Sequence, residues 1–387
     1  MLPFDARLPF VLLDNARVGG TAACRLYTSP VEVVVARHMR EVQPALDRIA
    51  EAVDQGLYAA GYLSYEAGFA LENRLFPLGR DLAEGLPLLW FGLFAREIPI
   101  RPDEMPALLP PPGTAHAGPP RPLIDQAAYA DGFDQMQQLI RAGDIYQANL
   151  TFQCDVPVTG DPAALYAAVR ARGGAGYGAL INMGHAWLLS FSPELFFTLS
   201  DGELRARPMK GTAPRSDDPV QDAKLASELR TDPKQRAENL MIVDLLRNDL
   251  SRVARAGSVE VPDLFRVETY PTIHQMTSTV RARMLPGLGP VEALRALFPC
   301  GSVTGAPKIR AMEAIHAIEA GPRGPYTGAI GRIGPDGDAA FNVAIRTLSL
   351  VEGASHARLG LGSGVVADSR MADEWAECLA KARFLSQ

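Results

Sequence analysis

Residues 179–199 read ALINMGHAWLLSFSPELFFTL and contain three short apolar runs, at 179–181, 185–190 and 195–199. Each run is rich in large aliphatic or aromatic residues and is bounded by Gly, Pro, Asn or Ser, which is typical of β-strands. We therefore expect three successive strands in this part of the chain.

The rest of the chain mixes strands and helices in no regular order. Strands are expected at 59–65 and 88–94, whereas the sequence favours helices at 34–52 and 129–142. There is no regular strand and helix alternation, no repeat period and no GxGxxG motif. These features predict an α+β fold with large antiparallel sheets rather than a doubly wound parallel sheet.

One stretch interrupts this pattern. Residues 99–122, PIRPDEMPALLPPPGTAHAGPPRP, combine many prolines and glycines with few periodic apolar positions, as extended linkers do. The chain has 387 residues, enough for one large core or two smaller ones. We therefore predict an N-terminal subdomain at 1–98 that contributes strands, a linker at 99–122 and a larger domain at 123–387.

Charge and cysteine content exclude several classes of protein. The formal net charge is −6 and no long Lys/Arg block occurs, which argues against a nucleic-acid partner or an anionic membrane surface. No apolar run approaches the roughly 20 residues of a membrane span. The cysteines, which form no CxxC pair, favour a reducing, cytoplasmic setting over a zinc cluster or disulfide framework; they are Cys24, Cys154, Cys300 and Cys378. Small molecules or proteins are the expected partners.

Two predicted helices carry most of the acidic chemistry. The first is capped by Asp232, starts at Pro233 and closes at Gly257, and Glu238 lies within it among apolar residues. Glu238 is therefore either close to buried surface or a solvated residue at the helix edge.

The second helix begins near Asp373 and runs to the end of the chain. Its residues Glu374, Glu377 and Lys381 fall at i, i+3 and i+7, so they project from one face. An ordinary surface ion pair between Glu377 and Lys381 is one interpretation. The other is a metal held by carboxylates of two helices, with water and substrate oxygens completing an octahedron, which is typical of magnesium.

Lys210 stands between Pro208 and Gly211 in RPMKGT, residues 207–212, at a predicted strand end. It is either merely exposed or a nucleophile. A nucleophilic amine must be neutral, which calls for desolvation or for neighbouring cations such as Arg205 and Arg207.

Further segments suggest anion binding. Residues 298–315, FPCGSVTGAPKIRAMEAI, form a small-residue loop that enters a helix through Pro307, so the backbone N–H groups around Thr304 could hold a carboxylate or simply cap the helix. The Walker spacing is missing. RGPYTGAIG around Tyr326 and FNVAIRTL around Arg346 are expected to be neighbouring strands, in which the arginine is either a carboxylate fork or part of a structural ion pair.

Taken together, these segments resemble the chorismate-binding enzyme family, which includes anthranilate, aminodeoxychorismate, isochorismate and salicylate synthases. The resemblance covers residues 144–381 and rests on motifs in the family's order, namely GDIYQANLTF, FSPELFF, RPMKGT, AENLMIVDLLRNDLSRV, TYPTIHQMTSTV, FPCGSVTGAPKIRAMEAI, RGPYTGAIG, FNVAIRTL and GSGVVADS. It implies paired antiparallel sheets flanked by helices in a layered α/β/β/α sandwich, with 123–387 as the catalytic domain.

Two positions separate the chemistries within this family. Isochorismate-type members carry a lysine base where this chain has Gln147, and glutamine cannot serve as that base. Anthranilate synthases have a small residue where this chain has Lys210, whereas aminodeoxychorismate synthases have lysine. The resemblance thus implies that Lys210 adds to C2 of chorismate while Glu194 protonates the departing C4 hydroxyl, and that ammonia then adds at C4. The product would be 4-amino-4-deoxychorismate, on the route to para-aminobenzoate and folate.

The same resemblance implies the remaining site residues. Glu238 and Glu377 match magnesium ligands, with Glu374 beside them. Residues expected around the substrate, either at its carboxylates or along its ring, are Gln147, Thr212, His274, Thr304, Tyr326, Arg346, Gly364 and Lys381. A dianionic substrate needs such cations to offset its desolvation.

Ammonia would have to come from a partner. No glutaminase-like segment with a nucleophilic Cys is found, so we expect a separate glutamine amidotransferase subunit; a fused lyase with pyridoxal phosphate is not expected. The rival interpretations are an anthranilate synthase, disfavoured by Lys210, and a non-catalytic binding subunit, disfavoured because Glu194, Lys210 and the acidic residues are all present.

Overall fold

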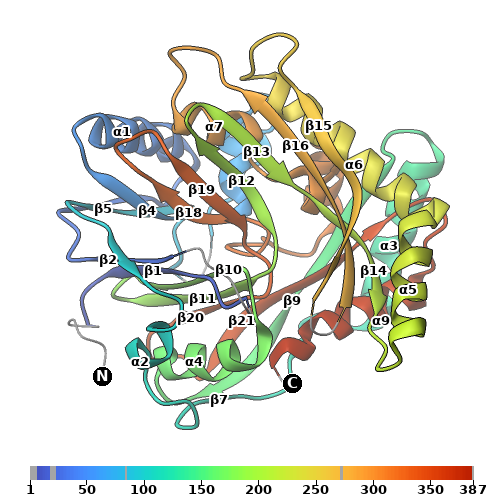
Figure 1. The fold of residues 1–387 in the computed structure, drawn as a ribbon, viewed down its shortest axis with the longest axis horizontal. Coiled ribbons are helices and arrows are strands. Elements are labelled where there is room, and N and C mark those ends of the chain that lie inside the picture. The colour runs from blue at the N-terminus through green and yellow to red at the C-terminus, as the bar shows by residue number, and fades with distance from the viewer. Residues whose placement is uncertain (1–6, 18–22, 83–84, 271–272, 386–387) are drawn as a thin grey trace.

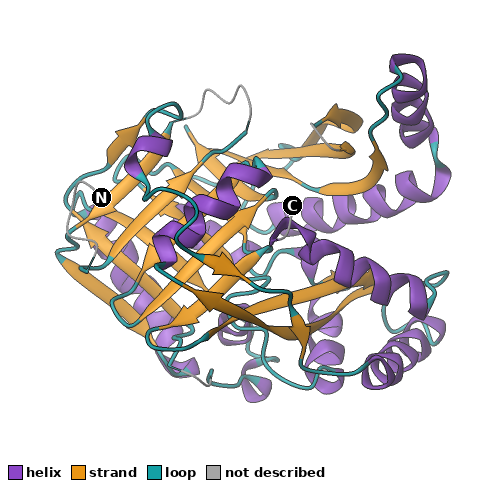
Figure 2. Cartoon of the chain, turned by 90° about the horizontal axis from the view of Figure 1, so that it is seen from below, coloured by secondary structure: helices purple, strands orange, loops and turns teal. Residues whose placement is uncertain are grey.

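The computed structural model describes residues 7–17, 23–82, 85–270 and 273–385. Two large sheets, in which all pairs of neighbouring strands are antiparallel, form the centre of the molecule, and helices cover their outer faces (Figures 1 and 2). The predicted α+β class and the layered α/β/β/α arrangement are therefore confirmed.

The first sheet has eleven strands. Its main path runs β17 (Gly305–Ala306), β9 (Gln147–Thr159), β21 (His356–Val365), β20 (Thr347–Val351), β11 (Ala186–Ser192), β10 (Tyr177–Asn182), β1 (Phe10–Asp14), β2 (Cys24–Thr28) and β6 (Ile98–Ile100), while β7 (His116–Ala117) and β8 (Arg121–Pro122) pair with β9.

The second sheet has ten strands. Its main path runs β14 (Met209–Pro214), β16 (Ile273–Arg283), β13 (Glu203–Arg207), β12 (Leu195–Ser200), β19 (Ala339–Val343), β18 (Ala329–Ile333), β4 (Tyr58–Leu63), β5 (Leu89–Phe94) and β3 (Glu32–Ala36), and β15 (Glu260–Thr269) pairs with β16.

The three strands expected within 179–199 are β10, β11 and β12, but they do not share one sheet. The first two pair with each other in the eleven-stranded sheet, and β12 pairs with β13 and β19 in the other sheet. The chain therefore crosses between the sheets at Pro193 and Glu194, which lie between β11 and β12. This crossing places Glu194 in the space between the layers.

Apolar side chains from both sheets meet in one buried layer. Val11 and Ile181 of the first sheet pack there with Tyr62, Trp90 and Phe94 of the second. Because successive side chains of a strand point to opposite faces, their neighbours Phe10 and Leu12 join the other core, which also includes helix residues. The central strands are thus buried on both faces, which explains their nearly continuous apolar sequences.

The helices lie on the outer faces and at one end of the sandwich. They are α1 (Val42–Asp54), α2 (Met105–Leu108), α3 (Gln126–Arg141), α4 (Pro162–Gly173), α5 (Pro219–Thr231), α6 (Pro233–Ser251), α7 (Pro290–Leu297), α8 (Lys308–Ile318) and α9 (Met371–Ala380). Short 3-10 helices are η1 (Met39–Glu41), η2 (Tyr65–Leu71), η3 (Phe76–Leu78), η4 (Gly301–Val303) and η5 (Lys381–Leu385). Helix α1 packs on β3, β4 and β5, and Figure 1 shows α5, α6 and α9 together at the opposite end.

Two predicted helix boundaries are wrong. The helix expected at 34–52 begins only at Val42, because residues 32–36 form strand β3, in which Val34 and Ala36 are buried while Val33 and Val35 are exposed. This alternation has the two-residue period of a strand. The helix expected to close at Gly257 ends at Ser251, because the next residues pair with the end of β16; the Arg255 N–H donates to the Arg283 carbonyl at 2.8 Å.

The strands before residue 98 are part of both sheets. β1 pairs with β10 in the first sheet, and β4 pairs with β18 in the second. The division of the chain at 99–122 stays a prediction. Among the described residues, no helix has both the length and the apolar character needed to cross a membrane.

Candidate active site between the sheets

One face of the paired strands β9 and β21 forms a platform of small and amide side chains. Gly364 lies opposite Asn149 in this pairing, and Gly362 lies opposite Thr151. A Cβ atom at Gly364 would be 2.9 Å from Nε2 of Gln147 and 3.3 Å from both Oδ1 of Asn149 and Nζ of Lys210. The amine of Lys210 therefore reaches this platform from β14, at the edge of the other sheet.

Lys210 owes its position to an irregular strand. The register between β14 and β16 shifts between Met209 and Thr212, and Gly211 has φ of +90°, a conformation that glycine adopts readily. Lys210 is the second residue of β14, so it lies at a strand end as predicted, in the part of the strand where the register shifts. Burial, followed by the nearby charge of Lys381, lowers the pKa of the Lys210 amine, while Glu194 opposes this shift. The interpretation of Lys210 as a merely exposed residue is wrong.

Glu194 lies close enough to Lys210 for their charges to interact. The residue is 7% exposed, and its Oε1 accepts a hydrogen bond of 2.7 Å from the Ser302 hydroxyl. Burial raises the pKa of the Glu194 carboxyl, and Ser302, Lys210 and Lys381 partly offset this rise. A buried carboxyl with a raised pKa can carry a proton, which is what a general acid requires. Sequence reasoning placed Ser302 in an anion-binding loop and missed its contact with Glu194.

The predicted metal carboxylates come from α6 and α9. Glu377 pairs with Lys381 at 2.8 Å, and Glu374 accepts a 2.7 Å hydrogen bond from the Ser369 hydroxyl. Burial raises the pKa of Glu238, with Glu374 among the neighbouring carboxylates that add to this rise. Lys381 also donates to the Gly362 carbonyl at 2.8 Å, so its ion pair with Glu377 is connected to the platform.

The predicted metal carboxylates do not form a complete metal site by themselves. Within the described parts of the chain, no three His, Cys, Asp or Glu side chains converge into a cage that could hold a metal by itself. Magnesium, however, is usually bound by one or two carboxylates together with waters and substrate oxygens. A cation there would relieve the like-charge repulsion that helps to raise the pKa of Glu238. The residues present therefore suit a magnesium ion shared with a substrate.

Sequence reasoning did not identify two charged residues beside the predicted metal carboxylates, Lys234 and Asp368. Lys234, one turn before Glu238 on α6, forms a 2.9 Å ion pair with Asp368, which precedes α9. The pair connects the two helices that carry the predicted metal carboxylates. Asp368 stands in the Gly-rich segment before the helix, so its place in that segment was the available signal.

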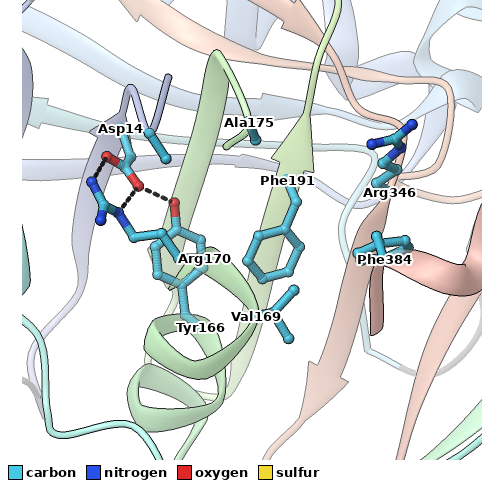
Figure 3. Close-up of a pocket in the computed structure, with 9 residues that line it drawn as sticks. Asp14, Tyr166, Val169, Arg170, Ala175, Phe191, Arg346 and Phe384 are labelled. Carbon is cyan, nitrogen blue, oxygen red and sulfur yellow. Dashed lines mark hydrogen bonds and ion pairs between the residues drawn. The ribbon is translucent and has the colours of Figure 1, made fainter. Parts of the chain in front are cut away.

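Arg346 is a cation without a structural partner. It lies between β19 and β20 rather than inside a strand as predicted, and its φ of +50° is uncommon for a residue with a side chain. Among the described residues, Arg346 has no side-chain hydrogen bond or ion pair, and burial lowers its pKa. It borders a small cavity that also contains the Asp14–Arg170 ion pair, and Figure 3 shows the Arg346 guanidinium apart from that pair. A buried cation that is not neutralised within the described residues has its hydrogen-bond donors available for an anion.

Tyr326 and Thr304 lie in turns that border the platform. The Tyr326 ring leaves no room for a side chain at Gly360, where a Cβ would be 2.1 Å from ring atoms. Tyr326 precedes β18 instead of lying inside it, although β18 and β19 do pair as expected. The Thr304 carbonyl accepts from the Asn149 N–H at 2.9 Å, and its hydroxyl donates to the Cys300 carbonyl at 2.8 Å.

The side chains of His274 and Thr212 form their hydrogen bonds with residues other than Lys210. The His274 ring contacts Asp222 of α5 at 2.9 Å and Thr269 at 3.1 Å. The Thr212 hydroxyl donates to Oε1 of Gln275 at 3.0 Å, and Thr212 is exposed. Both side chains therefore belong to the edge formed by α5, β14 and β16, and their predicted contact with a substrate ring stays a prediction.

The sequence model of one protein family, described as chorismate binding enzyme, matches residues 15–387. The chain belongs to the chorismate-binding enzyme family. Its predicted membership and the fold that this membership implies are both confirmed.

Known members of this family resemble the chain over most of its length. Aminodeoxychorismate synthase component 1 of Klebsiella aerogenes is 42% identical over 268 residues, which cover 69% of this chain and 59% of that protein. Anthranilate synthase component 1 of Streptomyces coelicolor is 40% identical over 263 residues, covering 68% and 51%. The chain thus spans about half the length of the curated relatives it matches.

A solved member of the family has the same architecture. The crystal structure of anthranilate synthase component I from Streptococcus pneumoniae TIGR4 superimposes with a TM-score of 0.80 at 25% identity, covering 96% of this chain and 93% of that one. Relatives named aminodeoxychorismate synthase and anthranilate synthase are therefore similarly close to the chain, so overall similarity does not distinguish between them.

Proposed function

We propose that this chain is the chorismate-aminating subunit of an aminodeoxychorismate synthase. The observation that supports this function most directly is the Lys210 amine, which lies between the sheets beside Gln147 and Gly364 with a lowered pKa. A lysine in such surroundings is more readily neutral, and the neutral amine is a nucleophile. The relatives named aminodeoxychorismate synthase point in the same direction.

The proposed reaction has two steps. The lone pair of Lys210 forms a bond to C2 of chorismate as the ring double bond shifts and the C4–O bond breaks; Glu194 gives its proton to the departing hydroxyl, which leaves as water. Ammonia then forms the C4–N bond, the double bond shifts back and the C2–N bond to Lys210 breaks. Proton loss from the added nitrogen restores the acid form of Glu194, and the product is 4-amino-4-deoxychorismate.

The substrate would be held by the cations around the platform. The guanidinium of Arg346 is suited to bind a carboxylate. Tyr326, whose ring lies beside Gly360, and Lys381, which donates to the Gly362 carbonyl, are suited to bind polar groups of the substrate on the platform. Gly364 carries no side chain, so the polar ends of Gln147, Asn149 and Lys210 can approach one another beside its backbone. Gln147 offers an amide for hydrogen bonding, but no base that could activate water.

The product of the reaction tests the proposal. Incubation with chorismate, magnesium and an ammonium salt is expected to give 4-amino-4-deoxychorismate, which added lyase converts to para-aminobenzoate. Anthranilate as the product would overturn the proposal in favour of the ortho-aminating reaction of other family members. Absence of turnover under these conditions, with chorismate bound, would favour a non-catalytic binding subunit instead.

Magnesium is proposed as the cofactor, held by Glu238 and Glu377 with Glu374 beside them. When bound, it would hold the ring carboxylate of chorismate and offset its charge. We expect Glu238→Gln to raise the magnesium concentration needed for half-maximal turnover at least ~10-fold, and to weaken binding of Mn²⁺ measured by electron paramagnetic resonance. The matched control is Glu228→Gln, on the exposed side of α5, which should change neither quantity. Unaltered Mn²⁺ binding by Glu238→Gln would contradict the assignment.

The amino group is proposed to come from a glutamine amidotransferase partner, which hydrolyses glutamine and passes on ammonia. The relatives' name "component 1" supports a multi-subunit enzyme. A cytoplasmic location is also proposed, because the four cysteines are all buried and free, as is usual in reducing compartments.

Arg346 and Arg170 offer a contrast between binding and stability, because both border the same cavity. Arg346→Met is expected to raise the KM for chorismate ~10- to 100-fold, the value of one charged hydrogen-bonding group, without lowering the melting temperature, because no structural ion pair is lost. Arg170→Met should instead destabilise the fold by ~3–5 kcal/mol, since it leaves the buried Asp14 carboxylate unpaired. Steady-state kinetics and thermal unfolding of both variants check this, and destabilisation by Arg346→Met would contradict it.

A further inference from the structure

Arg323 and Glu319 form an ion pair behind the platform. Their side chains are 2% and 5% exposed, and the guanidinium meets the carboxylate through two hydrogen bonds, of 2.9 Å to Oε2 and 2.7 Å to Oε1. Glu319 follows α8, and Arg323 precedes the turn that contains Tyr326. Neither residue is among the groups assigned to the substrate or the metal.

The remaining donors of Arg323 reach three separate segments. One terminal nitrogen donates to the Asn149 carbonyl on β9 at 2.8 Å, and the other donates to the Val303 carbonyl at 3.0 Å and to the Thr327 hydroxyl at 3.3 Å. Asn149 is two residues from Gln147, Val303 precedes Thr304, and Thr327 follows Tyr326. Each segment held by Arg323 therefore carries a residue expected to contact the substrate.

Further contacts fix the pair itself. Glu319 Oε1 accepts from the Thr151 N–H at 2.8 Å, which ties the carboxylate to the same strand β9. Glu66 accepts from the backbone N–H groups of Arg323 at 2.6 Å and Gly324 at 2.9 Å, and the Tyr65 ring lies 4.3 Å from the guanidinium carbon. Arg323 is thus held by η2, which carries Tyr65 and Glu66, as well as by Glu319, which directly follows α8.

The geometry demands an arginine. A guanidinium has five N–H donors in a rigid plane, and all five are used here, two on Glu319 and three on Asn149, Val303 and Thr327. A lysine has three donors on a flexible chain and cannot join these segments at once. Buried ion pairs often add little to stability compared with apolar residues, so the extent of this network favours a role in fixing geometry.

We propose that Arg323, held in place by Glu319, is a positioning residue. It fixes the relative positions of three segments that border the substrate site: strand β9 at Asn149, the loop at Val303 and the turn at Thr327. It acts through Asn149, through the loop that ends in Thr304 and through the turn after Tyr326, and it does not touch the reacting atoms. This inference rests on the proposed function insofar as these segments bind chorismate.

The test compares Arg323→Lys with a control variant that is expected to lose stability through truncation of a buried apolar side chain. Leu46→Ala truncates a fully buried side chain of α1, which packs on β3, β4 and β5 and also contacts η2. Leu46 makes none of the hydrogen bonds around Arg323, and α1 carries no residue assigned to the substrate or the metal. Both variants are assayed as chorismate consumption with magnesium and ammonium, at temperatures equally far below their own melting temperatures. Chorismate consumption is followed so that an unexpected product of the unmodified protein would refute the proposed function without affecting this comparison.

Arg323→Lys is expected to lower kcat ~10- to 100-fold, because misplacement of binding groups by about 1 Å has effects of this size, while Leu46→Ala keeps kcat within about twofold. Glu319→Gln keeps the size of the side chain but replaces one carboxylate oxygen by an NH₂ group, which cannot accept a hydrogen bond from Arg323 or Thr151. This variant should also lower kcat. If Arg323→Lys fails to fold, Glu319→Gln decides the question alone. Variants of Arg323 and Glu319 that match the kcat and KM of Leu46→Ala would overturn the proposal.

Discussion

Replacing Lys210 by alanine is expected to lower chorismate amination on the order of 10³-fold or more, because the variant has no amine to form the bond to C2. The unmodified protein is incubated with chorismate and magnesium but without ammonia, and is then quenched. Intact-protein mass spectrometry should show a covalent adduct that is missing in Lys210→Ala. The exposed Lys224 of α5 provides the control, since Lys224→Ala should keep both the rate and the adduct. Full amination by Lys210→Ala would refute the covalent route and leave membership of the family untouched.

The same residue makes a separate prediction about stability. Because the pKa of Lys210 is lower in the folded protein than in the unfolded chain, its burial costs folding free energy below the folded-state pKa, and the cost disappears above the unfolded-state pKa. Lys210→Met should therefore be at least as stable as the unmodified protein at neutral pH, as measured by chemical denaturation. An inactive but equally stable variant would show that the lost function does not come from unfolding.

Replacing Glu194 by glutamine is expected to lower kcat by ~10²- to 10⁴-fold, the usual contribution of a general acid. Gln has nearly the same shape and can still accept the hydrogen bond that Ser302 donates to Oε1, so the fold should be kept. Only the transferable proton is lost.

The pH profile supplies the discriminating measurement for Glu194. Activity requires Lys210 neutral, which favours high pH, and Glu194 protonated, which favours low pH, so the unmodified protein should show a bell-shaped profile. Burial raises the pKa of Glu194 and lowers that of Lys210, and both shifts enlarge the active fraction at neutral pH. In Glu194→Gln the descending alkaline limb should vanish. A descending limb that persists would assign it to another group.

Sequence reasoning could name candidate residues more readily than it could predict how they are arranged in space. The identities of Glu194, Lys210 and the acidic residues of α6 and α9 could be recognised because their motifs are local, each within a few residues of a glycine, a proline or a helix boundary. The predicted helix boundaries were wrong where backbone groups form hydrogen bonds with a distant segment instead of within a helix. Residues 34–36 joined a sheet edge beside β5 instead of extending a helix, and residues after Ser251 paired with β16.

Contacts across the site could not be predicted for the same reason. The hydrogen bond from Ser302 to Glu194 joins residues 108 positions apart, and the bond from Arg323 to Asn149 spans 174 positions. Neither distance leaves a periodic trace in the sequence, because such contacts depend on the order of strands in the sheets. The unpaired state of Arg346 is likewise a property of its surroundings and not of its motif.

The sequence by itself determined the class of fold, the family and the kinds of reactive side chain, since strand and helix periodicity and local motifs are encoded by near neighbours in the chain. Only the tertiary structure decided that the Lys210 amine lies between the sheets near Glu194 and Lys381, where burial lowers the pKa of Lys210 and raises that of Glu194. Desolvation and Coulomb interactions depend on what lies within a few ångströms in space, and the packing of two sheets brings together residues that the sequence keeps far apart.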